Sequence, residues 1–553
     1  MLALKPRDFV LVGLLAALFV AARLWRLDAS CLWFDEVFSV HAARHEWRAL
    51  LDFVALDLIH PPLFYLLLKS WIALTGSEAV WWLRLFPVLT AAAAIIPVLL
   101  LCRELRLRRP VACQLALLLM CVNGFLIQHA REVRMYSLLF LLAASSLWLF
   151  ARFSRSDTPQ RRRDGLALFA VNLALVYTHY FGWLLVGHEL IFLVVWERRR
   201  VKVFALMLAA LVVCYSPWLL MVWQAAGGAG KGLAQNIGWA VAPRLSEILQ
   251  PFLLLHEPFR FRQNTHEPPV LRVNVWLALI LFVPPLVALG WRLVRPRRLL
   301  AAARKLDGET TETARDAGRF SASQNLALTF LIFFSTAPVI VAFVLASVLP
   351  HSIWGTRHLI IIAPVYLLLA ATALDSLRRP FWLATTIKLL LACWLTVAAM
   401  LWLMRPGGAP PIWCAWETLA RQVDHSEPSG GDEIKVYAFE DLVAYHLWYA
   451  TSSIDGAQRF RIATVVNLPG LAEDKAFFLP RGFDEVAVTE LGAAMREEHF
   501  WAAYRVAASG NTAAEHPVLR TLSERGYEIE RRLEVTASGQ KAFMISVRRR
   551  RAP

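Results

Sequence analysis

Residues 325–349 read NLALTFLIFFSTAPVIVAFVLASVL, a run that contains no charged side chain. An α-helix rises about 1.5 Å per residue, so ~20 apolar residues cross the ~30 Å hydrocarbon core of a bilayer. Similar apolar runs recur from residue 9 to residue 403 of the 553-residue chain. One such run would indicate an anchor, whereas many indicate that the membrane-embedded part does the protein's work. The sequence therefore predicts a polytopic α-helical membrane protein.

About eleven stretches are long and apolar enough to be predicted as transmembrane helices. The first follows a basic start with Lys5 and Arg7, as in a signal peptide, but it lacks a small-residue cleavage pattern. We therefore expect it to be retained as a span. The predicted spans are 9–25, 82–101, 111–128, 134–152, 164–178, 181–196, 203–221, 273–294, 325–349, 358–376 and 381–403.

The composition agrees with this class of protein. Hydrophobic residues make up 58% of the chain and charged residues only 18%, below the ~25% of a soluble domain. The net charge of +16 comes from basic residues in short clusters between apolar runs. Such clusters orient spans with their positive ends in the cytoplasm. We therefore expect membrane lipids, and no nucleic acid, as partners.

Six basic clusters are expected on the cytoplasmic side; they are Lys5 with Arg7, 103–109, 152–163, 198–202, 292–305 and 378–379. This arrangement requires that the apolar stretch 60–74 lies along the membrane surface instead of crossing it. Two juxtamembrane helices are then expected in the first outer loop, 26–81. A full crossing at 60–76 would instead invert every later span. The first arrangement places the N-terminus in the cytoplasm and the chain after residue 404 outside it.

The chain after residue 404 changes character, because a Pro- and Gly-rich linker at 406–411 is followed by polar residues and short alternating runs. We expect a transmembrane domain over 1–404 and a soluble α/β or α+β domain over 405–553, with a supporting or acceptor-binding role. Its predicted strands are 433–439, 460–466, 484–488, 528–535 and 541–547, and its predicted helices are 416–423 and 517–525.

The outer loop 224–272 contains a glycine-rich stretch at 227–232. This flexible composition suits a lid. The seven cysteines are scattered without a CxxC pair or metal-ligand spacing, so most are predicted to be small core residues.

The first polar pattern on the outer face is Trp33-Phe34-Asp35-Glu36, shortly after the first span. Two adjacent acids in an apolar setting can cap a helix, with Asp35 accepting hydrogen bonds from free backbone N–H groups. They can also supply a carboxylate base that takes a proton from an acceptor hydroxyl or amine. Spacing alone leaves both interpretations open.

A second pattern, at 128–136, contains Arg131, Glu132, Arg134 and Tyr136 in a short outer turn. Arginine is normally sparse on this side of a membrane. Anchoring at lipid headgroups would explain the pair. An anionic phosphate would explain it as well, because guanidinium groups bind phosphate in bidentate fashion. Glu132 would then hold the arginines in place or bind an acceptor.

Two more patterns lie at the same depth. Arg357 and His358 directly precede a span, and His179 and Tyr180 lie in a turn between two spans. A snorkelling arginine and a solvated histidine are the simpler interpretations. Taken together, however, the four patterns suit a substrate with an apolar tail, a phosphate and a polar group to transfer.

At these residues the sequence resembles the GT-C membrane glycosyltransferases, specifically the protein O-mannosyltransferase-like group (family 39). That group also contains the lipid A aminoarabinose transferase. The resemblance covers about residues 8–375, in the family's order. The matching stretches are Phe34-Asp35-Glu36, His60-Pro61-Pro62-Leu63-Phe64-Tyr65, 130–136, 178–182 and Gly355-Thr356-Arg357-His358.

The resemblance implies a GT-C fold and an inverting transfer from a polyprenyl-phosphate sugar, on the outer side of a bacterial inner membrane. Asp35 would be the general base. The residues implied to bind the donor phosphate are Arg131, Arg134, Tyr136, Arg357 and His358. Glu36 and Glu132 would orient the acceptor or the arginines, and His60, His179 and Tyr180 would line the pocket.

Several alternatives stay open at this point. The acceptor could be a protein, a lipid or a polysaccharide. No cofactor is certain, and a divalent cation is possible although no metal-ligand motif is present. A transporter or lipid flippase would also explain many spans with charged groups near the membrane. The chain shows none of the repeated halves that many transporters have, so the glycosyltransferase is preferred.

Overall fold

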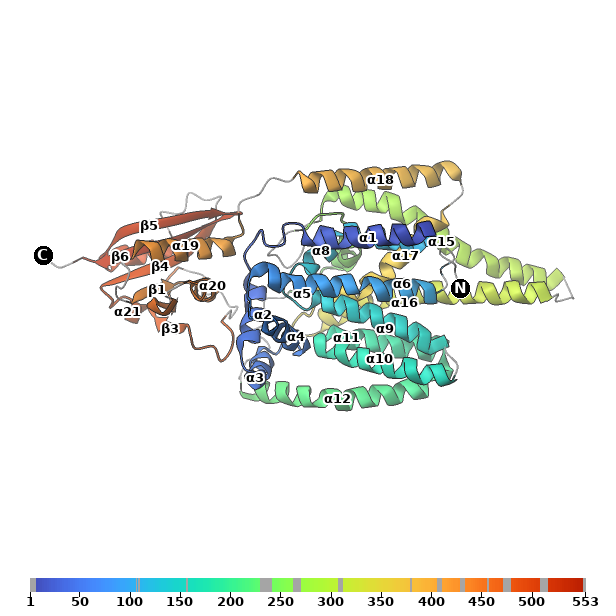
Figure 1. Ribbon diagram of the computed structural model, residues 1–553, viewed down its shortest axis with the longest axis horizontal. Coiled ribbons are helices and arrows are strands. Elements are labelled where there is room, and N and C mark those ends of the chain that lie inside the picture. Colours follow the sequence, from blue (N-terminus) through green and yellow to red (C-terminus); the bar gives the residue numbers. More distant parts are fainter. Residues whose placement is uncertain are drawn as a thin grey trace. The chain divides into compact units, whose positions relative to one another are not determined.

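The computed structural model divides the chain into two compact units (Figure 1). The helical unit comprises Met1–Leu27, His60–Met221 and Ala240–Met404, and the sheet unit comprises Asp28–Ile59, Val222–Trp239 and Arg405–Pro553. The structure describes residues 6–105, 107, 110–155, 158–228, 241–261, 270–306, 312–377, 380–404, 410–427, 433–454, 457–470, 479–507 and 516–550.

Each of the predicted spans falls in helical structure of the helical unit. The helices are α1 Pro6–Leu24, α5 Val80–Ala93, α6 Ile95–Glu104, α7 Pro110–Val122, α8 Gly124–Ala130, α9 Tyr136–Arg155, α10 Thr158–Thr178, α11 Phe181–Trp196, α12 Val201–Gly228, α15 Arg272–Leu306, α16 Glu312–Val348, the 3-10 helix η3 Thr356–Ile362, α17 Ala363–Ser376 and α18 Phe381–Leu403. Many of the long helices run side by side (Figure 1). The predicted polytopic helical class is therefore confirmed.

Within the described residues, seven helical stretches are long and apolar enough to cross a membrane. They are Val80–Glu104, Tyr136–Arg155, Arg198–Gly227, Arg272–Trp291, Asn325–Val348, Thr356–Ser376 and Phe381–Leu403. The apolar helices Val111–Val122 and Phe181–Trp196 are shorter. The number of eleven crossings and their direction therefore stay predictions.

The stretch 111–128 forms two helices instead of one because Asn123 interrupts it. The Asn123 side chain accepts a hydrogen bond from the Leu126 N–H (2.8 Å) and donates to the Leu254 carbonyl (3.0 Å). A side chain on Gly124 would place its Cβ 2.1 Å from the Arg260 carbonyl oxygen, so only glycine permits this approach. The Gly124 N–H donates to the Glu257 carbonyl (2.8 Å). Short helix α8 is therefore tied to the segment around residues 254–260.

The first outer loop contains three helices where two were predicted. They are α2 Phe34–Arg44 and α3 Trp47–Asp57 of the sheet unit, and α4 Leu63–Ala73 of the helical unit. The break between α2 and α3 falls at His45 and Glu46, which have extended backbones. Helix α4 has 11 residues, or about 16 Å. This is about half of the hydrocarbon thickness, so α4 is too short to cross it alone.

The C-terminal part of the sheet unit is a six-stranded sheet of order β3-β2-β1-β4-β6-β5. Its strands are β1 Ile434–Ala438, β2 Phe460–Val466, β3 Ala487–Glu490, β4 His499–Ala507, β5 Tyr527–Ala537 and β6 Gln540–Arg549. The first four are parallel to one another, and β6 pairs antiparallel with both β4 and β5. Its helices include α19 Ile412–Ser426, α20 Asp441–Thr451, α21 Leu491–Ala494 and α22 Pro517–Glu524. The predicted α/β or α+β class is confirmed, although β4 and α20 were not predicted.

Apolar side chains of the helices and strands form the core that stabilises the sheet. Ala415, Trp416, Leu419 and Val423 form one buried face of α19, as expected for an amphipathic helix. Strand β4 is buried from Phe500 to Tyr504. The most buried part of the sheet therefore includes the inner strand β4.

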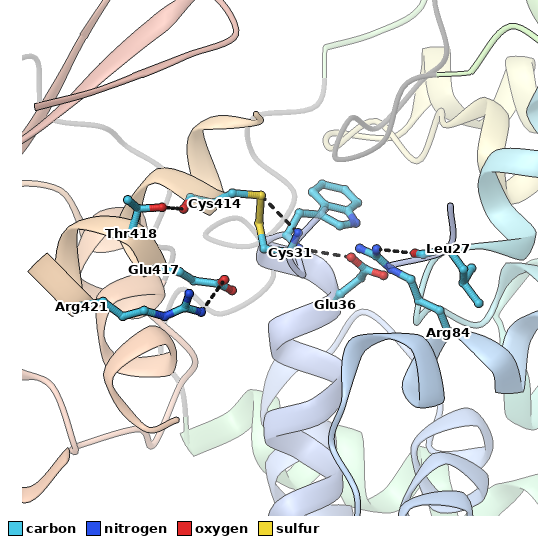
Figure 2. Close-up of a disulfide and its surroundings, with 9 residues drawn as sticks. Leu27, Cys31, Glu36, Arg84, Cys414, Glu417, Thr418 and Arg421 are labelled. Carbon is cyan, nitrogen blue, oxygen red and sulfur yellow. Dashed lines mark hydrogen bonds and ion pairs between the residues drawn. A yellow bond between two sulfur atoms is a disulfide. The ribbon is translucent and has the colours of Figure 1, made fainter. Parts of the chain in front are cut away.

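Two disulfides correct the expectation that most cysteines are small core residues. Cys102 pairs with Cys113 in the helical unit, and Cys31 pairs with Cys414 in the sheet unit. The second disulfide ties the segment before α2 to the first turn of α19 (Figure 2). Of the predicted lid, residues 229–240 and 262–269 lie outside the described residues. The described part contains η2 Leu245–Leu249 and α14 Gln250–Leu254.

Candidate functional site

The short turn between α8 and α9 carries three buried ionisable residues, Arg131, Glu132 and Arg134. Glu132 accepts hydrogen bonds from two side chains of α8, His129 Nδ1 at 2.9 Å and Gln128 Nε2 at 3.2 Å. These hydrogen bonds join Glu132 to residues three and four positions earlier in the chain and so hold the backbone of the turn. Glu132 therefore orients the segment that carries the two arginines.

Arg134 extends from this turn toward the residues that lead into α4. Its guanidinium lies 3.5 Å from the Tyr65 hydroxyl and 3.5 Å from His60 Nε2. Both contacts are at the long end of hydrogen bonding. The Tyr65 hydroxyl and the His60 ring help to orient the guanidinium.

His179 lies in the turn between α10 and α11, and its ring is held in one tautomer. The backbone N–H of Phe181 donates to His179 Nδ1 (3.1 Å), so the proton of the neutral ring resides on Nε2. Among the described residues, buried Nε2 has no hydrogen-bond partner. This N–H is therefore a donor aimed into the interior and suited to an incoming acceptor.

A glycine makes this turn possible. A Cβ on Gly182 would lie 2.8 Å from the Leu175 carbonyl oxygen, closer than side chains normally approach. The His179 N–H donates to the same carbonyl (3.1 Å). Gly182 thus lets α11 pack closely on the end of α10 and fixes the position of His179.

Helix η3 brings Arg357 and His358 to the same group. The His358 ring centroid lies 4.8 Å from that of His179 and 6.3 Å from that of Tyr136. The Arg357 guanidinium lies over the Tyr136 ring, 5.6 Å from its centroid. The His60 and His179 rings are 5.6 Å apart. We call this set the arginine–histidine cluster; its members are His60, Tyr65, Arg134, Tyr136, His179, Arg357 and His358.

The charge distribution at the cluster is positive. Burial lowers the pKa of His179 well below its usual range, and His60, Arg357 and Arg134 lower it further by charge repulsion. The three residues that lower the pKa of His179 by charge repulsion are all basic. The nearest carboxylate in the turn, Glu132, accepts from His129 and Gln128. A group of basic side chains, most of them buried, together with the His179 Nε2–H is suited to binding an anion such as phosphate.

The lowered pKa of His179 has a consequence for stability. The folded protein keeps this ring neutral, whereas the unfolded chain protonates it near pH 6.5. Stability is therefore lost as the pH falls below 6.5, by on the order of 1 kcal/mol between pH 7.5 and 5.5. Thermal unfolding of His179→Gln in detergent should lack this part of the pH dependence. Replacing the exposed His425 by Gln is the matched control and should leave the wild-type pH dependence in place.

The two candidate acids lie in the sheet unit, on the first turn of α2. Asp35 is partly exposed, whereas Glu36 is fully buried. The Glu36 carboxylate accepts a hydrogen bond from the Trp33 backbone N–H (3.2 Å) and so caps its own helix (Figure 2). Glu36 therefore has a structural task, while the more accessible Asp35 is the better candidate for contact with a substrate.

Two other predicted residues make different contacts. Arg131 donates to the Arg26 carbonyl and lies 5.3 Å from the centroid of the Phe261 ring. Tyr180 is partly buried at the start of α11, where its carbonyl accepts from the Trp183 N–H (3.0 Å). Sequence reasoning did not assign a role to Tyr65, although it belongs to the 60–65 motif.

A divalent cation was left open by the sequence. Within the part of the chain that the structure describes, no group of three or more His, Cys, Asp or Glu side chains is placed to hold a metal ion. The histidines of the cluster lie beside arginines, and nearby positive charge opposes cation binding.

Comparison with known proteins gives a result at the level of fold. No protein-family model matches this chain, and no curated protein matches it in sequence. The crystal structure of ArnT from Cupriavidus metallidurans in the apo state matches with a TM-score of 0.58 at 13% identity, over 97% of each chain. ArnT bound to undecaprenyl phosphate gives 0.56 at 12% identity, again over 97% of each chain.

A more distant structure is archaeal oligosaccharyltransferase AglB from Archaeoglobus fulgidus, in complex with an inhibitory peptide and a dolichol-phosphate. It has a TM-score of 0.42 at 14% identity and covers 80% of this chain and 63% of its own. The match to ArnT extends over both the helices and the C-terminal sheet, because it covers nearly the whole chain.

The fold of this chain is therefore similar to that of ArnT over nearly its whole length. The resemblance first noted in short polar motifs is confirmed for the architecture of the whole chain.

Proposed function

We propose that this protein is an inverting glycosyltransferase that uses a polyprenyl-phosphate sugar as donor. The observation that carries the proposal is the arginine–histidine cluster. Three separate stretches of chain bring the basic side chains of Arg134 and Arg357 and the Nε2–H of His179 into one group, in which Arg134 and His179 are buried. The fold similarity to ArnT, which binds undecaprenyl phosphate in one crystal structure, supports the same ligand class here.

The cluster would act on the leaving group. When the bond between the sugar's anomeric carbon and the phosphate oxygen breaks, the lipid phosphate gains negative charge. Arg134 and Arg357 would stabilise this charge, and His179 Nε2–H would donate to a phosphate oxygen. Preorganised donors in a buried site contribute about 3–4 kcal/mol each to such a step. Arg131, Tyr136 and His358 would complete the donor-binding region, with His60 and Tyr180 lining it.

Asp35 would act on the nucleophile. Its carboxylate would take the proton from an acceptor hydroxyl or amine as the acceptor attacks the anomeric carbon. Attack from the side opposite the leaving phosphate inverts the configuration and needs no covalent enzyme intermediate. Glu36 would hold α2 in shape, and Glu132 would hold the arginine-bearing turn.

The transfer reaction would take place at a membrane, on the side opposite the cytoplasm. The protein is a multi-pass membrane protein, and the basic clusters favour an N-terminus in the cytoplasm with the reaction on the opposite face. A bacterial inner membrane would supply undecaprenyl-phosphate donors. The acceptor is a protein, a lipid or a polysaccharide.

The test is a transfer assay with purified protein and a panel of undecaprenyl-phosphate sugars, with envelope extract as acceptor. Released lipid phosphate and the labelled product are both quantified. We expect turnover with one donor and release of one lipid phosphate per sugar transferred. Movement of the intact donor across liposomes without lipid phosphate release would instead support a flippase.

A further inference from the structure

We infer that the C-terminal sheet domain positions the helix that carries Asp35. A disulfide fastens the chain before this helix, and an aromatic clamp around His41 fastens its far half. His41 and Tyr445 would then be positioning residues for the transfer reaction. This inference rests on the proposed function and assigns a role to the domain after residue 410.

The first fastening is the Cys31–Cys414 disulfide, which spans 383 residues of sequence. Cys31 lies in the short segment that leads into α2, two residues before Trp33 and four before Asp35 in the first turn. Cys414 lies in the first turn of α19. A covalent bond therefore joins the start of the acid-bearing helix to a helix that packs in the core of the sheet domain (Figure 2).

The second fastening is the clamp around His41, on the same helix as Asp35. His41 is 3% exposed, and its Nδ1 lies 3.0 Å from the Tyr445 hydroxyl of α20. Its ring packs on Trp448, with centroids 4.6 Å apart, and on Phe483, at 4.9 Å. Phe53 of α3 closes the remaining side at 4.8 Å.

Other contacts extend the clamp along the whole segment. Phe34, the neighbour of Asp35, makes an edge-to-face contact with Tyr445, with centroids 5.5 Å apart. At the other end of α2, Arg44 donates to the Ser452 hydroxyl (3.3 Å). At the end of α3, Arg481 donates to the Leu56 carbonyl (3.2 Å). Tyr445 thus touches α2 on both sides of Asp35.

The interior of the clamp is apolar. Burial, then His45 and Arg44, lower the pKa of His41 to about 3, so the ring is neutral at physiological pH. The neutral ring either accepts a hydrogen bond from the Tyr445 hydroxyl or donates one to its oxygen. Either bond restrains the rotation of α2 about its axis.

This arrangement matters because α2 cannot hold its own position. It has 11 residues, fewer than the ~12–15 at which isolated helices become even marginally stable in water. A misplacement of ~1 Å at a reacting group can lower a rate by ~100-fold. The base therefore depends on the domain that fixes both the start and the rotation of its helix.

The first test compares Tyr445→Ala with Tyr504→Ala in the full-length protein. Tyr504 is also a buried tyrosine of this domain, but it packs on His516 and Phe543. We expect Tyr445→Ala to lower kcat by about 10–100-fold, with the donor KM nearly unchanged. Tyr504→Ala should cost similar thermal stability and leave kcat much closer to wild type. Tyr445→Phe keeps the ring contact with Phe34 but loses the hydrogen bond to His41, so it should show a loss between that of Tyr445→Ala and wild type.

The second test removes the disulfide. The double variant Cys31→Ser, Cys414→Ser is compared with Cys102→Ser, Cys113→Ser, which removes the other disulfide. We expect only the first pair to lower kcat, and reduction of wild type by a thiol to reproduce that loss. Equal loss from both pairs, or no loss from the first, would overturn the inference.

A third readout does not depend on turnover. Amide hydrogen exchange of residues 34–44 should become faster in Tyr445→Ala and in the Cys31, Cys414 variant, but not in Tyr504→Ala. Unchanged exchange would overturn the inference even if the enzyme is active. If wild type transfers no sugar while exchange responds as expected, the proposed function fails and the coupling between domain and helix stands.

Discussion

Arg134→Ala is expected to lose at least about 100-fold in kcat/KM for sugar transfer. The side chain is 3% exposed and projects from a turn that Glu132 holds in place. Its removal takes away a positive charge beside His179 and His60, where the lipid phosphate would develop its negative charge. The loss should appear in both donor binding and turnover, measured as initial rates over a range of donor concentrations.

Arg134→Lys and Arg23→Ala serve as controls for this result. Lysine keeps the charge but lacks the planar fork that binds two phosphate oxygens, so we expect an intermediate loss. Arg23 is another buried arginine of the helical unit, and it donates to the Phe19 and Met120 carbonyls. A loss in Arg23→Ala as large as in Arg134→Ala would mean that general damage to the fold, and not phosphate binding, explains the effect.

Asp35→Asn is expected to lower kcat by about 10²–10⁴-fold, the usual contribution of a general base. The donor KM should change little, because the carboxylate acts on the acceptor. Asparagine has nearly the same shape, and the helix cap from Glu36 to the Trp33 N–H remains. The variant should therefore keep the thermal stability of wild type while losing transfer.

The matched control is Asp52→Asn, which removes an exposed carboxylate from the neighbouring helix α3. We expect wild-type transfer from it. Retention of substantial transfer by Asp35→Asn would remove Asp35 from the role of base and direct attention to the other carboxylates of the chain.

The helices of this protein could be predicted from the sequence because a bilayer demands long apolar runs. Strands β2 and β6 could be predicted as well, since each is a short run rich in apolar and β-branched residues. Strand β4 was missed because it lies in the middle of the sheet, and residues buried on both faces leave no alternating pattern. Helix α20 was missed because its buried residues, 443–447 and 450–451, do not form a simple stripe.

The candidate site could be predicted only in part. Short motifs indicated Arg134, Arg357, His179 and His358, and the structure brings these four together with Tyr136. Arg131 belongs to the same motif, but its contacts include the Arg26 carbonyl, because the direction of a side chain in a tight turn depends on backbone geometry. The Cys31–Cys414 pair could not be predicted, since no spacing rule connects cysteines 383 residues apart.

The central claim is that the arginine–histidine cluster holds a lipid-linked phosphate. Its most direct test is the structure of the purified protein in complex with undecaprenyl phosphate. We expect the phosphate within hydrogen-bond distance of the Arg134 guanidinium and of His179 Nε2. A phosphate bound elsewhere, with both of these groups more than about 5 Å from its oxygens and so beyond hydrogen-bond reach, would contradict the account.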